Sequence, residues 1–130
     1  MTVEMKDILK DGITVKEVLE NLKKREKQFK KGCTFKERGE IIRREFPDIY
    51  ENIMEKAEQN IKGMAILPGS PDYHFIGNPV KWKENVYNYD EYTYQLHRMV
   101  HWRNMAEAYS FTGEERFAKK IIEEFYQWVE

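Results

Sequence analysis

The spacing of apolar residues along the chain predicts a helical protein. In the first half of the chain, apolar positions recur every three or four residues in three successive stretches, at about 15–31, 35–46 and 48–62. Residues with that spacing lie on one face of an α-helix, and the polar residues between them lie on the other. We therefore expect three amphipathic helices before residue 63.

Residues that begin and end helices stand at the borders of these stretches. Thr14-x-x-Glu17 and Thr34-x-x-Glu37 have the form of capping boxes, in which the threonine and glutamate satisfy free backbone N–H groups. Pro47 cannot continue a helix from the residues before it, so we expect the second helix to end at Phe46. Asp48 is then expected to cap the third helix.

Residues 64–90 have a different character, because three prolines and two glycines interrupt any regular pattern. A loop of this length inside a compact domain is uncommon and is often functional. The alternative is a loop that lies over the helices and is held there by Phe75, Trp82 and Tyr87. The sequence leaves both interpretations open.

The last 40 residues predict two more helices. The first begins at Asp90 or Glu91 and runs to about Phe111, and Thr112-x-x-Glu115 has the form of a third capping box that opens the second. Their short connection predicts an antiparallel hairpin. No strand pattern competes, so the fold class is all-α, in a single helical domain over 1–130.

The stretch YQLHRMVHWRNMAEAY, at 94–109, carries unusually many polar side chains for a helix that must pack. On a continuous helix, two opposite faces are expected. The first is a packing face, apolar except at its start, formed by Gln95, Arg98, Met99, Trp102, Met105, Ala106 and Tyr109. The second is narrow and polar, formed by His97, His101, Asn104 and Ala108. The i, i+4 histidines could hold a metal, but no third ligand is evident, which favours hydrogen bonds between helices. Neither a metal nor a cofactor is therefore predicted. Arg98 could reach an anionic ligand or anchor loop carbonyls, and both remain open.

Charge and composition narrow the possible partners. The chain has 22 basic and 23 acidic residues among 130, so its net charge of −1 gives no general attraction to nucleic acid. The basic run at 23–31 is expected to be a solvated helix face, and the single cysteine excludes an internal disulfide. No apolar run is long enough to span a membrane, and no signal peptide is visible. We therefore expect a cytoplasmic protein, or a periplasmic or secreted one whose signal has been removed.

The segment YQLHRMVHWRNMAEAYSFTGEERFAKKIIEEFYQW resembles the N-terminal region of the heparinase II/III family of polysaccharide lyases, particularly its heparinase III-like branch. The matching positions are Gln95, Leu96, His97, Arg98, Trp102, Met105, Ala106, Tyr109, Thr112, Gly113, Glu114, Glu115, Phe117 and Ala118. The preceding NPVKW is also similar, although Lys81 stands where the family usually has Asp or Asn. The resemblance covers about 75–128, and the first 60 residues match only in being helical.

This resemblance implies the first, incomplete part of an (α/α) toroid of paired helices, which a β-sandwich completes in full-length members. It also implies that this chain is part of a larger enzyme, which cleaves uronic-acid glycans such as heparan sulfate by β-elimination. The family's catalytic Asn, Tyr and His residues lie beyond the matched region, so no catalytic residue is assigned to this chain. Trp82, Gln95, His97 and Arg98 are the candidates to line or brace the glycan cleft.

The resulting hypothesis is an N-terminal lyase segment that is catalytically incomplete alone. Its expected partners are an acidic, heparan sulfate-like polysaccharide and the remainder of the lyase chain. The last helix is broadly apolar up to residue 129, which suggests that an element covering it is missing and predicts self-association through an exposed apolar face. The alternative is a stand-alone helical interaction module without enzymatic activity.

Overall fold

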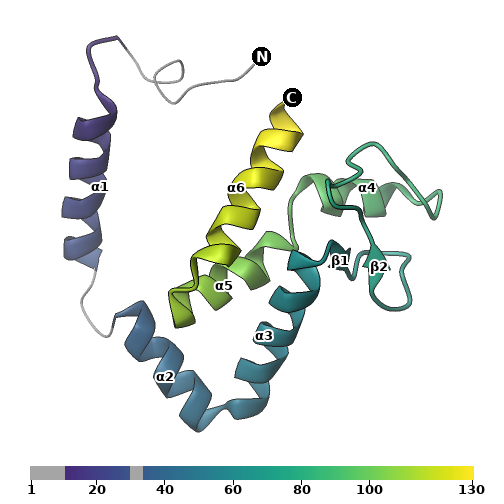
Figure 1. Ribbon diagram of the computed structural model, residues 1–130, viewed down its shortest axis with the longest axis horizontal. Coiled ribbons are helices and arrows are strands. Elements are labelled where there is room, and N and C mark those ends of the chain that lie inside the picture. The colour runs from purple at the N-terminus through teal and green to yellow at the C-terminus, as the bar shows by residue number, and fades with distance from the viewer. Residues whose placement is uncertain (1–10, 30–33) are drawn as a thin grey trace. The chain divides into compact units, whose positions relative to one another are not determined.

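The computed structural model describes residues 11–29 and 34–130, which form six helices and one short antiparallel sheet (Figure 1). The chain divides into two compact units, and α1 (Val15–Phe29) belongs to the first. The second, Phe35–Val129, is called the helical unit below. Its elements are α2 (Phe35–Glu45), α3 (Pro47–Ile61), β1 (Met64–Ala65), β2 (His74–Phe75), α4 (Asp90–His97), α5 (Trp102–Thr112) and α6 (Glu115–Val129).

The all-α expectation is confirmed, because each strand is only two residues long. No helix in the described part of the chain is long and apolar enough to cross a membrane.

The first capping box is also confirmed: the Thr14 backbone N–H donates to Glu17 Oε2 at 2.8 Å, and the Glu17 N–H donates to Thr14 Oγ1 at 3.2 Å. The backbone N–H of Thr14 and its hydroxyl, which also donates to Glu17 Oε2 at 2.8 Å, lower the pKa of Glu17. The basic run at 23–31 lies partly outside the described residues.

The join between α2 and α3 differs from the expectation. Pro47 is the first residue of α3, Phe46 occupies the cap position, and Asp48 lies in the first turn rather than at the cap. Proline is well suited to the first helical position, since its fixed φ matches a helix and its missing N–H would have had no partner there. Asp48 still places its negative charge near the positive end of the helix dipole.

Two adjoining hydrophobic cores hold the helical unit together. The first lies between α3, α5 and α6 and contains Ala57, Met105, Ala108 and Phe117, which are all fully buried. The small side chains of Ala57 and Ala108 let these helices approach closely. Gly39 of α2 makes an even closer contact, because a Cβ built there would lie 2.8 Å from the Cα and Cβ of Phe111.

The second core is built by the segment between α3 and α4 that was expected to be a loop, together with α4 itself. Its buried residues are Ala65, Leu67, Ile76, Val80, Trp82, Tyr92 and Leu96. β1 pairs with β2 in the register Met64–Phe75 and Ala65–His74, and Gly77 forms a bridge to Val80. Of the three aromatic residues expected to hold this segment, only Trp82 is buried, while Phe75 and Tyr87 are exposed. The segment therefore forms part of the hydrophobic core and does not merely lie over the helices.

The predicted helix from about 90 to 111 is broken into α4 and α5. Arg98 caps α4, and Met99 adopts a left-handed conformation with a φ of 55°. That conformation is uncommon for a residue other than glycine, and it stops the helical hydrogen-bond ladder. As a result, the two faces expected from a continuous helix are wrong: His101 and Ala108 are buried, whereas Ala106 is exposed.

The α5–α6 hairpin is confirmed, but its expected capping box is not. Thr112 is the last residue of α5, and its hydroxyl donates to the Ala108 carbonyl at 2.8 Å and accepts from the Glu114 N–H at 3.1 Å. Gly113 follows in a left-handed conformation, with a φ of 73°, and ends α5. Closure into a toroid and the single domain over 1–130 stay predictions.

We expect Gly39→Ala to destabilise the helical unit. Overpacking against Phe111 typically costs about 1–3 kcal/mol, and the better helix propensity of alanine returns at most about 1 kcal/mol. Urea unfolding followed by circular dichroism would measure the difference. Glu40→Ala, at the next and exposed position of α2, should change the free energy of unfolding by less than about 0.5 kcal/mol. Equal stabilities for both variants would contradict the close α2–α5 contact.

Candidate functional site

A buried carboxylate organises the polar residues of the second half of the chain. Glu124 of α6 is fully buried, and its Oε2 accepts hydrogen bonds from His101 Nε2 at 2.8 Å and from Trp102 Nε1 at 2.6 Å. Both donors stand at the start of α5. A buried carboxylate needs such donors, because it loses the hydration that stabilises its charge in water.

Lys120, one helical turn before Glu124, supplies the opposite charge. Its Nζ lies 3.6 Å from Glu124 Oε1, within ion-pair distance but too far for a hydrogen bond. The same Nζ donates to Asn78 Oδ1 at 2.6 Å, in the irregular segment before α4. We call Asn78, His101, Trp102, Lys120 and Glu124 the polar cluster. It ties α5 and α6 to the irregular segment.

Trp82 and His97, two of the predicted cleft residues, lie together beside the polar cluster. The Trp82 ring centroid lies 6.0 Å from that of His97 and 6.2 Å from that of His101, and Trp102 meets it edge-on. Trp82 is buried, whereas His97 is exposed and accepts a hydrogen bond at Nδ1 from Trp128 Nε1 at 3.1 Å. In this position Trp82 can brace His97 but can present little of its own ring to a ligand.

The other two candidates, Gln95 and Arg98, share one partner. Gln95 Nε2 donates to Glu91 Oε1 at 2.6 Å, and an Arg98 guanidinium nitrogen lies 3.6 Å from the same oxygen. The Arg98 side chain is 65% exposed. The alternative of a buried arginine that anchors loop carbonyls is therefore wrong. The guanidinium stands where an external anion can reach it, and contact with glycan stays a prediction.

The two i, i+4 histidines act separately, because the helix break lies between them. His97 binds α6 through Trp128, and His101 binds α6 through Glu124. The interpretation as hydrogen bonds between helices is thus confirmed. In the described ranges, no group of three or more His, Cys, Asp or Glu side chains is arranged to hold a metal ion.

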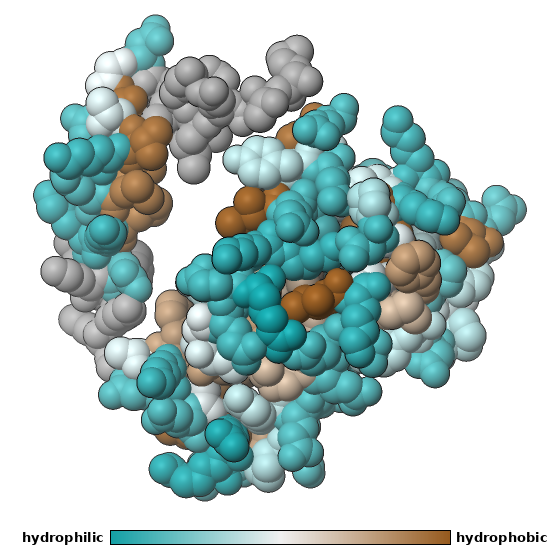
Figure 2. All heavy atoms as spheres, in the orientation of Figure 1, coloured by the Kyte–Doolittle hydropathy of each residue, from teal (hydrophilic) through white to brown (hydrophobic). Residues whose placement is uncertain are grey.

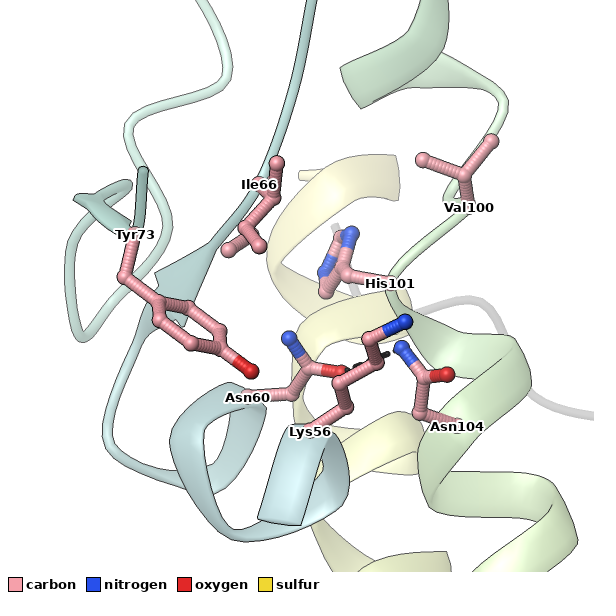
Figure 3. Close-up of a pocket in the computed structure, with 8 residues that line it drawn as sticks. Lys56, Asn60, Ile66, Tyr73, Val100, His101 and Asn104 are labelled. Carbon is pink, nitrogen blue, oxygen red and sulfur yellow. Dashed lines mark hydrogen bonds between the residues drawn. The ribbon is translucent and has the colours of Figure 1, made fainter. Parts of the chain in front are cut away.

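A pocket of about 300 Å³ lies beside His101 (Figure 3). Its lining residues come from α3, from the ends of β1 and β2, from the α4–α5 connection and from the first turn of α5. They are Lys56, Asn60, Ala65, Ile66, Tyr73, Val100, His101 and Asn104. Asn60 is buried, donates to the Met64 carbonyl at 2.9 Å and accepts from Asn104 Nδ2 at 3.1 Å. These two bonds fix the floor of the pocket.

Two further groups give the pocket its chemistry. Burial, with the nearby charges of Glu55 and Asp72, raises the pKa of Tyr73, so its hydroxyl keeps its proton and can donate. His101 Nδ1 is buried without a hydrogen-bond partner. Sequence reasoning missed this pocket. Its one signal was Asn60, a polar residue three positions after Ala57 on the apolar face of α3.

We expect Glu124→Ala to destabilise the helical unit strongly, since it leaves the His101 and Trp102 donors without their acceptor and Lys120 without its counter-charge. Breaking a buried ion pair by removing one partner costs about 3–5 kcal/mol. Chemical unfolding would measure the loss. Glu123→Ala, at the neighbouring exposed position, is the control and should change stability by less than about 0.5 kcal/mol. A loss for Glu124→Ala no larger than that of the control would show that the polar cluster contributes little.

The family described as Heparinase II/III N-terminus matches residues 11–130. No curated protein matches the chain, and no solved structure matches it. The match extends upstream of the resemblance seen at 75–128 and covers all described helices, including α1. With its helical fold, its α5–α6 hairpin and this match, the chain belongs to the heparinase II/III N-terminus family.

Proposed function

We propose that this chain is the N-terminal helical domain of a heparinase III-like polysaccharide lyase. The family match over residues 11–130 carries this proposal. The complete enzyme would cleave a uronic-acid glycan such as heparan sulfate by β-elimination. The chain itself would bind and position the glycan, while residues elsewhere in the polypeptide perform the chemistry.

The reaction explains why this domain alone would be inactive. The C5 proton of a uronate is weakly acidic, so its carboxylate must be neutralised while a base removes the proton and an acid protonates the leaving oxygen. The polar cluster is unsuited to these tasks. Glu124 is fully buried and committed to His101, Trp102 and Lys120, which makes it a structural group.

The surface of α4 supplies groups suited to an acidic sugar chain. The exposed guanidinium of Arg98 can form paired hydrogen bonds with a carboxylate or sulfate, and Gln95 beside it can bind a hydroxyl. His97 offers an exposed ring, held from behind by Trp82 and from α6 by Trp128. The remaining exposed part of Trp128 adds an aromatic face of the kind on which sugars stack.

An exposed apolar stripe on α6 supports a domain that packs against further chain. Ala118, Ile122, Phe125 and Val129 recur at helical spacing on one side of α6, and Ile122 and Phe125 are 54% and 45% exposed. Figure 2 shows hydrophobic side chains at the surface over α6. Another helix of a toroid would cover such a stripe. In an isolated domain the same stripe would favour self-association.

The second candidate is a stand-alone interaction module without enzymatic activity. The helical unit favours it in one respect, because its two cores and its polar cluster are built entirely from its own residues. In that case the α6 stripe would be a docking surface for another protein. The two candidates differ in the size of the native polypeptide and in its chemistry.

To separate the candidates, an antibody against the chain would be used to blot a lysate of the source organism. The lyase proposal expects a band several-fold heavier than 15.8 kDa. That complete polypeptide should also release products with the ultraviolet absorbance of a C4–C5 double bond from heparan sulfate, whereas the 130-residue chain should release none. A native band at 15.8 kDa, or a larger protein that leaves every uronic-acid glycan intact, would refute the proposal.

Within the complete enzyme, we expect Arg98→Ala to raise KM for an acidic glycan, because a charge-assisted contact with the polymer is lost. The side chain is 65% exposed, so the free energy of unfolding should change by less than about 1 kcal/mol. Steady-state kinetics and thermal unfolding would be measured together. Arg103→Ala, which removes an 82% exposed arginine of α5, is the matched control. An unchanged KM for Arg98→Ala would remove Arg98 from the glycan contacts.

A further inference from the structure

The pocket beside His101 is separate from the proposed glycan contacts. None of Trp82, Gln95, His97 and Arg98 is among its lining residues. Its volume of about 300 Å³ lies at the lower end of the range for small-molecule sites, and such sites combine apolar walls with a few well-placed polar groups. A ligand of monosaccharide size matches this volume better than a polymer does.

The polar groups converge on the pocket from three directions (Figure 3). Lys56 and Asn60 stand one turn apart on α3, Tyr73 directly precedes β2, and Asn104 lies in the first turn of α5. Lys56 contributes a positive charge, and the protonated hydroxyl of Tyr73 contributes a hydrogen-bond donor. Glu55 and Asp72, the two acidic residues whose charges act on Tyr73, are exposed to solvent and are not among the lining residues. This combination suits a carboxylate.

His101 adds a buried acceptor. Its Nε2 faces Glu124 Oε2 at 2.8 Å, and a carboxylate only accepts hydrogen bonds, so Nε2 must carry a proton. In the neutral ring Nδ1 then holds a lone pair. That atom is buried without a partner in a side chain that is 1% exposed, and leaving a buried polar group unsatisfied is costly. Because the atom is closed to solvent, a ligand hydroxyl reaches it only after a small shift of the surrounding pocket wall, and that contact would then satisfy it.

We propose that this pocket binds a small hydroxy acid of monosaccharide size. The ligand's carboxylate pairs with Lys56 and accepts a hydrogen bond from Tyr73, and one of its hydroxyls donates to His101 Nδ1. Ala65, Ile66 and Val100 form the apolar wall against which the C–H face of the ligand rests. This inference goes beyond the proposed function, because it requires neither a polymer nor an elimination reaction.

Three ligands of similar size separate the two recognition contacts. The ¹⁵N-labelled 130-residue chain would be titrated with D-glucuronate, with D-glucose, which lacks the carboxylate, and with cyclohexanecarboxylate, which lacks the hydroxyls. We expect saturable shifts of the Asn60 and Asn104 side-chain amides and of His101 Nδ1 with D-glucuronate. A hydrogen bond to a charged group is worth enough to change affinity roughly tenfold or more, so D-glucose should bind at least that much more weakly. The hydroxyl contact joins two neutral groups, so cyclohexanecarboxylate should bind several-fold more weakly.

Matched variants test the residues. Lys56→Gln should weaken D-glucuronate binding roughly tenfold or more, and Tyr73→Phe should weaken it several-fold, because hydrogen bonds to charged groups are lost. Lys119→Gln on α6 and Tyr94→Phe on α4 make the same chemical changes at exposed positions outside the pocket, and they should leave the affinity unchanged. Circular dichroism would verify that each variant keeps its fold.

Each outcome bears on the proposal. Absence of saturable shifts in the wild-type chain would overturn it, as would an unchanged affinity in Lys56→Gln. Equal binding of D-glucose would refute the carboxylate contact, and equal binding of cyclohexanecarboxylate, or an unmoved His101 Nδ1 signal, would refute the hydroxyl contact. These measurements use the 130-residue chain alone, so a failure here is distinct from a failure of the lyase assay on the complete polypeptide.

Discussion

The burial of the Glu124 carboxylate is the constraint on which the rest of the helical unit depends. A charge removed from water must find donors and a counter-charge within the protein, and three parts of the fold supply them. The start of α5 contributes His101 and Trp102, α6 itself contributes Lys120, and the irregular segment contributes Asn78, which holds Lys120. The hairpin and the irregular segment are therefore held in one arrangement by the same charge.

The break at Met99 makes this arrangement possible. On one continuous helix, Leu96 and His101 would lie about 140° apart, since each residue advances by about 100°. One of them would then face away from the core. The left-handed turn at Met99 begins a new helix, so that α4 buries Tyr92 and Leu96 while α5 buries His101, Met105 and Ala108. The left-handed turn at Met99 therefore allows the apolar face of α4 and the face of α5 that carries His101 both to reach the interior.

The same arrangement gives His101 two roles on its two nitrogens. Nε2 is hydrogen-bonded within the polar cluster. Nδ1 has no hydrogen-bond partner and belongs to a residue that lines the pocket with Lys56 and Tyr73. The Trp82 ring lies between His101 and the exposed His97. The polar cluster and the pocket therefore share His101, and Trp82 connects His101 to His97 on the α4 surface. A change in the polar cluster would thus be felt at both the pocket and the α4 surface.

Local signals in the sequence determined the helical class, the positions of α1, α2 and α3, the Thr14 capping box and the α5–α6 hairpin, because periodicity and capping act over only a few residues. They also determined the family resemblance at 75–128. Only the tertiary structure decided that residues 64–89 form a core, that Met99 breaks the helix, that Glu124 and Lys120 are buried, and that Lys56, Asn60 and Tyr73 meet His101. Each of those outcomes depends on contacts between residues far apart in the chain, and helical periodicity carries no information about which distant side chains will meet.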